Sequence, residues 1–312
     1  MEKSAKLGKL TLLNIILFGF IGQVAWAVEN NFFNTFLFSF GGTTKDISTM
    51  VAASAVVAVV TTFVMGTLSD KLGRRKVFIC AGYVAWGITV MAFAFISREN
   101  LGKLIGADPS SAAALSATVT TVIVMDCIMT FMGSTSNDSA FNAWITDVTV
   151  PSNRAKTEGL LAILPVLALV IVTGVFGFIA GDDAQASDYA TCFLGLGILV
   201  IICGIVGIFT IKDTGSGQKS DGNFFADLIY GFRPSVIKSH KCLYLSLACM
   251  GVYSIASQVF FPYIFIYIEH QISFGTKITV PAVIIAAIVI LAVIAGVLAS
   301  ILLMDKVGKA RF

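Results

Sequence analysis

The chain has 312 residues, of which 57% are hydrophobic and 12% are charged, and its mean hydropathy is +0.90. Soluble domains are roughly half apolar and a quarter charged, so this composition excludes a soluble fold and indicates a membrane protein. The net charge of +3 is too small to indicate a nucleic-acid partner. The six cysteines show neither disulfide nor zinc spacing, and no enzyme motif is recognisable. We therefore expect no metal site and no enzyme.

Eight stretches are long and apolar enough to cross a hydrocarbon core of about 30 Å as helices. In chain order they cover residues 10–38, 49–68, 77–96, 118–148, 160–180, 189–211, 242–268 and 278–304. The first also imitates a secretory signal, because Ala25-Trp26-Ala27 resembles a cleavage site. Apolar residues continue beyond that point, which favours an uncleaved first helix. The sequence predicts an all-α, polytopic membrane protein.

The basic residues predict the orientation of these helices. With the N-terminus in the cytoplasm, 17 of the 21 Lys and Arg residues fall in cytoplasmic segments. Cytoplasmic loops of membrane proteins carry such an excess. We therefore expect a multi-pass protein of the cell membrane with both termini in the cytoplasm.

A short sequence repeat indicates two related halves. The segment Asp70–Lys76 (DKLGRRK) recurs as Asp305–Arg311 (DKVGKAR), after the second and the eighth predicted helices. Internal duplication on this scale is typical of secondary transporters. We expect a six-helix bundle over residues 1–211, a polar cytoplasmic linker over 212–241 and the start of a second bundle over 242–312.

Three segments carry a resemblance to a known family. The turn Gly66–Lys76 is similar to the signature loop of the major facilitator superfamily, and Asp147–Lys156 is similar to its helix 4–5 junction. The segment Asn137–Trp144 resembles helix 4 of the glycoside–pentoside–hexuronide, melibiose-permease-like sugar symporters. This resemblance implies twelve helices and alternating access. With eight predicted helices, the chain is expected to be C-terminally truncated, with one complete half and two helices of the second.

Polar residues inside the predicted spans are candidate ligands, because a carboxylate at mid-bilayer costs about 2.5–3.5 kcal/mol. In helix 4, Asp126, Thr130, Ser134, Asp138 and Asn142 recur every four residues and form a polar stripe. Carboxylates and amides bind hydroxyl groups, and an indole packs on a sugar ring. The candidate substrate ligands are Gln23, Trp26, Asn30, Asn34, Asn137, Asp138, Asn142, Trp144, Tyr253 and Gln258. Bonds between helices, or an interfacial anchor for Trp144, are the alternative interpretation.

The same spans hold the candidate coupling groups. Glu29, Asp126 and Asp138 can carry a proton. The resemblance would place paired aspartates in the second helix of sodium-coupled members, but Ala58–Phe63 has no carboxylate. A melibiose-type Na⁺ site is therefore not expected, and H⁺ is the expected coupling ion, with uniport left open. No cofactor is expected.

The resemblance also implies a charged gate at the cytoplasmic face. Asp70 and Arg74 are expected to hold the cytoplasmic side closed, together with Asp147 and Arg154. The gate residues implied are Gly66, Asp70, Gly73, Arg74, Arg75, Asp147, Arg154 and Asp305.

The sequence thus predicts a proton-coupled symporter of sugars or glycosides. A drug or lysolipid transporter, and a truncated, inactive remnant or sensor, remain as alternatives. The expected partners are a small-molecule substrate, taken as a sugar, and the lipid bilayer, with no nucleic acid and no obligate protein partner.

Overall fold

The computed structural model describes residues 7–180, 186–213 and 229–260, and it is helical with no strand in these ranges. Six stretches are long and apolar enough to cross a membrane. The first is α1 (Lys9–Val28), η1 (Glu29–Phe33) and α2 (Asn34–Ser39); the second is α3 (Thr44–Leu72); the third is α4 (Arg75–Ala92) with η2 (Phe93–Phe95). The fourth is α6 (Ala112–Gly133), η3 (Ser134–Phe141) and α7 (Asn142–Val148); the fifth is α8 (Pro151–Leu161) with α9 (Leu164–Ala180); the sixth is α10 (Ala186–Thr210).

Four further elements complete the described part. Helix α5 (Arg98–Ile105), which the sequence pattern did not predict, begins at a Ser97 cap and ends at Gly106 in the left-handed region. The segments η4 (Tyr230–Phe232) and α12 (Pro234–Ser239) precede α13 (Lys241–Phe260), which starts one residue from the predicted seventh helix. The end of that helix and the predicted eighth helix, 278–304, lie outside the described residues.

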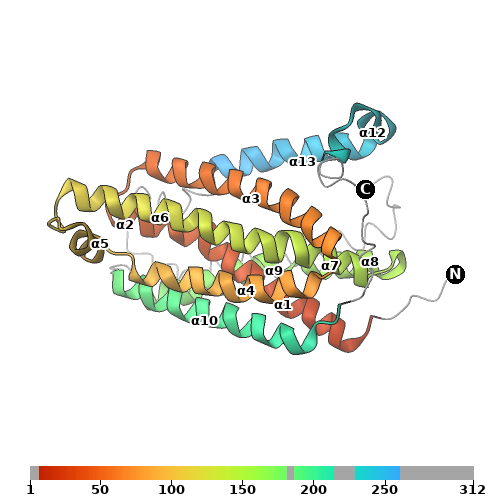
Figure 1. The fold of residues 1–312 in the computed structure, drawn as a ribbon, viewed down its shortest axis with the longest axis horizontal. Helices are drawn as coiled ribbons and strands as arrows, with labels where there is room; N and C mark the ends of the chain where they lie inside the picture. Colours follow the sequence, from red (N-terminus) through yellow and green to blue (C-terminus); the bar gives the residue numbers. More distant parts are fainter. Residues whose placement is uncertain (1–6, 181–185, 214–228, 261–312) are drawn as a thin grey trace, which may run out of the picture.

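The long helices run roughly side by side (Figure 1). The start of α1, α8 and α12 lie at one end of the molecule, and α5 lies at the opposite end. Three of the segments expected to be cytoplasmic therefore share one end.

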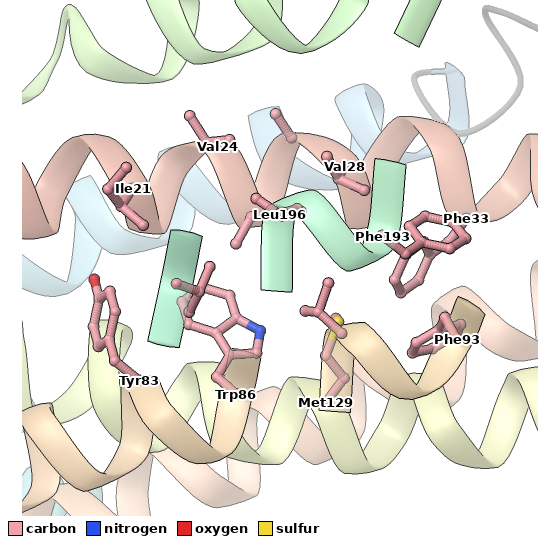
Figure 2. Packing of buried hydrophobic residues seen from close by; sticks show 14 of the residues in the cluster. Ile21, Val24, Val28, Phe33, Tyr83, Trp86, Phe93, Met129, Phe193 and Leu196 are labelled. Atoms are coloured by element: carbon pink, nitrogen blue, oxygen red, sulfur yellow. The ribbon is translucent and has the colours of Figure 1, made fainter. Parts of the chain in front are cut away.

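An aromatic core joins α1, α4 and α10 (Figure 2). The Phe33 ring lies 4.1 Å from that of Phe93 and 5.1 Å from that of Phe193, measured between centroids. Trp86 and Tyr83 are fully buried in the same layer. Aromatic side chains bury large apolar areas, so this layer fixes the three helices together.

Close backbone packing brings α4 and α10 together. A Cβ built on Gly87 would lie 2.6 Å from the carbonyl oxygen of Gly197, and one built on Gly197 would lie 2.2 Å from Cγ of Met91. Small residues allow helix backbones in membranes to approach each other. Larger side chains at these two positions would force α4 and α10 apart.

Two of the spanning helices contain a π-helical segment at mid-length, η1 and η3. In both, short polar side chains donate to carbonyl oxygens four residues earlier. The donors are Asn30, Asn31, Asn34 and Thr35 at 2.8–3.2 Å around η1, and Thr135 and Ser136 at 2.7 and 2.9 Å in η3. Such side chains compete with the backbone for its acceptors. This competition accounts for the wider winding at both places.

Residues 210–213, at the C-terminal end of α10 and just after it, contact several helix ends that lie near α8. The Lys76 amide donates to the Asp213 carboxylate at 2.9 Å, which caps the start of α4. Asn14 donates to the carbonyl oxygen of Thr210 at 3.0 Å, and the Trp144 indole donates to that of Lys212 at 3.4 Å. The ends of α1, α4 and α7 are thereby held against one segment.

Candidate transport cavity

A cavity of about 850 Å³ lies between the first, second and fourth membrane stretches, with Val259 of α13 at its edge. Its polar lining comes from all three stretches. These residues are Gln23, Trp26, Glu29, Asn30, Asn34, Ser48, Ser54, Asp126, Thr130 and Asp138. A mostly apolar pocket with a few convergent polar groups is the usual form of a small-molecule site.

The first membrane stretch supplies the polar face that its spacing predicted. Gln23, Trp26, Asn30 and Asn34 all line the cavity, and so does Glu29. Since the π-helical segment η1 begins at Glu29, the widened turn sets the direction of the two residues of this face that follow it, Asn30 and Asn34. Functional residues are frequent at such segments.

Two of the candidate coupling carboxyls are buried beside hydroxyl groups. Thr130 donates from Oγ1 to Oε1 of Glu29 at 2.9 Å. Asp126, which is 1% exposed, pairs with the hydroxyl of Ser54 on α3. Glu29 interacts electrostatically with Asp126 and, more weakly, with Asp138. Like charges this close disfavour simultaneous ionisation, which suits groups that exchange protons.

Asp138 lies at the boundary of the cavity within η3. Ser134 donates from Oγ to its carboxylate at 2.9 Å, and the Trp26 indole interacts with the same carboxyl. The Asp138 carboxyl and the Trp26 indole therefore both contribute to the cavity lining.

Asn137 has a different environment from the one expected of a ligand. It is buried outside the cavity lining, where it accepts from Nε1 of Trp26 at 3.3 Å and donates to the Tyr83 hydroxyl at 2.6 Å. Tyr83 in turn donates to the carbonyl oxygen of Phe18 at 2.7 Å. This chain of hydrogen bonds anchors the Trp26 ring to α4 and α1, so Asn137 positions a cavity residue.

Asn142 and Trp144 also lie outside the cavity lining. Asn142 is exposed and donates to the carbonyl oxygen of Asp138 at 3.0 Å. Trp144 is 2% exposed, stacks on Phe141 with centroids 6.1 Å apart and donates to Lys212. The four-residue stripe fails here because η3 breaks the helical period between Ser134 and Phe141. Trp144 therefore packs inside the helix bundle, in contact with Phe141 and with the segment after α10.

Two candidate substrate ligands, Tyr253 and Gln258, belong to the predicted seventh helix, and the structure describes the side chain of only the first. Tyr253 lines a second cavity of about 340 Å³ together with Ser254 and Ser257 of α13, and Gln23, Trp26 and Asn30 line its other side. The side chain of Gln258 lies outside the described residues. The face of the first helix is thus shared by two adjoining cavities.

At the end of the molecule that contains α8, Arg75 is the centre of a cluster of charged residues that were expected to form the gate. Its guanidinium binds Asp70 and Asp147, with 3.3 Å between Nε and the Asp147 carboxylate, and it donates to Oγ of Ser69 at 2.6 Å. This ion pair joins the end of α3, the start of α4 and α7.

The role expected of Arg74 belongs to its neighbour. Arg74 is exposed and takes part in none of the ion pairs of the described residues, because it precedes the first turn of α4 while Arg75 points inward. Arg154 donates to the carbonyl oxygen of Thr146 at 2.8 Å and to Oγ1 of Thr149 at 3.1 Å. Arg154 thereby caps the C-terminal end of α7, and it makes no ion pair with Asp147.

The gate glycines have separate roles. Gly73 ends α3 with φ 62°, in the left-handed region that favours glycine. Gly66 faces η3, where a Cβ would lie 3.6 Å from Oγ of Ser139. Asp305 lies outside the described residues.

Sequence reasoning missed three contributors. Ser48 and Ser54 line the cavity from α3. Their spacing as polar residues in an apolar segment is the sequence signal that could have identified them. Asp213, which caps α4, follows a long apolar helix as the first acidic residue. Only the packing of α4 against the segment after α10 shows its partner.

The fold and the cavity define a multi-pass membrane protein with a polar site between its helices, which is the form of a membrane transporter. Over residues 15–312 the chain matches the Major Facilitator Superfamily, and it belongs to that family. It is therefore a transporter that binds a small-molecule substrate within the bilayer. No curated protein and no solved structure gives a significant match to the chain.

Proposed function

We propose that the chain is a symporter that moves sugars or glycosides across the cell membrane together with protons, by alternating access, with both termini in the cytoplasm. The observation that carries this proposal is the meeting of a carboxylate, amides and an indole on one cavity wall. Asp138, Trp26 and Gln23 all line the cavity of about 850 Å³. Carboxylate and amide oxygens accept from sugar hydroxyls, and the indole covers the apolar face of the ring.

Proton coupling is supported by the environment of Glu29 and Asp126. Each has a hydroxyl partner, Thr130 and Ser54, and the two carboxyls interact electrostatically. Ionisable groups inside a membrane bundle are costly and mark substrate or proton pathways. A proton on one of the pair relieves the repulsion, and its release to the other side accompanies the substrate.

The Arg75 ion pair supports alternating access. It joins α3, α4 and α7 at the end of the molecule that contains α8, so its rupture would free these helix ends. We propose that this group is a cytoplasmic gate, closed in the state the structure describes.

Uptake of radiolabelled galactosides and pentosides by proteoliposomes tests the proposal. Asp138→Ala should abolish saturable uptake, and Asp138→Asn should reduce it. The control is Glu99→Gln, which removes a carboxyl on α5 that pairs only with Lys103 among the described residues. Wild-type uptake by Asp138→Ala would refute the site assignment.

Coupling needs a separate measurement. Glu29→Gln should lose uptake driven by a proton gradient while it retains exchange of labelled for unlabelled substrate, because exchange requires no net proton movement. If Glu29→Gln and Asp126→Asn both accumulate substrate as the wild type does, proton coupling through these carboxyls is refuted.

A further inference from the structure

Three buried acceptor oxygens in the cavity have no hydrogen-bond donor among the described residues. They are Oε2 of Glu29, Oδ1 of Asp126 and Oδ1 of Asn34. Asp126 and Asn34 are each 1% exposed, and all three residues line the same cavity. Buried polar atoms are almost always paired, so unpaired oxygens gathered in one place indicate that a ligand supplies the donors.

The charge of the lining has one sign. Glu29, Asp126 and Asp138 contribute three carboxyls, and no Lys, Arg or His of the described ranges is part of the lining. One proton shared by Glu29 and Asp126 still leaves a negative charge on that pair. A neutral sugar can supply hydroxyl donors but leaves this charge uncompensated, and a buried uncompensated charge is costly.

A protonated amine complements this arrangement. An ammonium group has three N–H donors and no acceptor, which matches three acceptors without donors. Its bonds to carboxylates are charge-assisted and stronger than those between neutral groups. The indole of Trp26, also on the cavity wall, offers a face for a cation.

A bare metal ion fits less well. No three His, Cys, Asp or Glu side chains within residues 7–180, 186–213 and 229–260 converge closely enough to hold one. The acceptors belong to an 850 Å³ space, which is far larger than an ion needs.

We propose that the preferred substrate is a hydroxylated solute with a protonated amine, of the amino-sugar class. Its ammonium binds Glu29, Asp126 and Asn34, and its hydroxyl groups bind Asp138 and the amide of Gln23. This inference rests on the proposed sugar transport, which accounts for the hydroxylated part of the substrate. The ammonium group is what the inference adds.

Binding to the purified full chain in nanodiscs, measured by calorimetry, tests the inference. The probes are galactosamine, N-acetylgalactosamine, galactose and propylamine. Galactosamine should bind about 10-fold or more tightly than galactose or the acetylated sugar, because charge-assisted hydrogen bonds contribute about 1.5–3 kcal/mol. Asp126→Asn should remove this preference, whereas Glu99→Gln should keep it. If Asp126→Asn aggregates, Glu29→Gln replaces it.

The outcomes separate the inference from the proposed function. Equal affinity for galactosamine and galactose would overturn the amine site and leave sugar transport standing. Binding of galactosamine and propylamine, with none of galactose, would support the amine site and refute neutral-sugar transport. Failure of all four probes to bind would overturn both. A preference that survives both Asp126→Asn and Glu29→Gln would also overturn the proposed location.

Discussion

Replacing Arg75 with alanine removes the guanidinium that binds Asp70, Asp147 and Ser69 at the gate. Breaking a fully buried ion pair costs about 3–5 kcal/mol, and an exposed pair contributes at most about 1 kcal/mol. The side chains of Arg75, Asp147 and Asp70 are 11%, 20% and 56% exposed. The Asp147 bond is thus largely buried and the Asp70 bond is screened, so the expected loss of stability is about 2 kcal/mol.

Thermal unfolding in detergent, followed by a thiol-reactive dye, measures this loss, because Cys80, Cys192 and Cys203 are buried in the fold, whereas the exposed Cys242 and Cys249 react before heating and set the baseline. A loss of about 2 kcal/mol corresponds to a fall in Tm of about 3 °C for a chain of this length. The matched control is Arg74→Ala, which removes the same charge from an exposed neighbour and should change Tm by less than about 1 °C. Equal shifts for the two variants would refute the assignment of the gate to Arg75.

Three further substitutions test the packing of the bundle by the same unfolding assay. A Cβ on Gly22 would lie 2.3 Å from Nδ2 of Asn137, so Gly22→Ala should destabilise the chain by about 1–3 kcal/mol and disturb the Trp26 anchor. Gly174→Ala meets no atom within 4 Å and should be neutral or stabilise by up to about 1 kcal/mol; a similar loss in both variants would contradict this packing. Asp213→Ala removes the cap on the Lys76 amide and should cost about 1 kcal/mol, and an unchanged Tm would show that this contact contributes nothing.

Hydropathy predicted the spanning helices well, because length and apolar content decide which segments enter a bilayer. The described spans 9–39, 75–95 and 188–210 lie within two residues of their predictions at both ends. Periodicity also predicted the face of Gln23, Trp26, Asn30 and Asn34. It did not predict the short amphipathic helix α5, which depends on the Ser97 cap and Gly106.

The side-chain partners could not be read from the sequence. Arg74 and Arg75 are adjacent and of equal charge, and only the start of α4 decides which of them turns inward. Asn137 is of a residue type that often binds substrate, but its hydrogen bond to Tyr83 depends on how η3 packs against α4. In each case the deciding contact lies between segments far apart in the chain.

Asp138 of the cavity lies within the π-helical segment η3, and Asp147 of the proposed gate follows on α7, so both belong to one continuous stretch of helix. Each residue of an α-helix turns the chain by about 100°, so a change in winding by one residue at η3 would rotate α7 about its axis. Such a rotation would carry Asp147 away from the guanidinium of Arg75 without any loss of membrane-spanning length. Ligand contact at Asp138 and release of the gate can therefore be two ends of one torsional movement within a single helix.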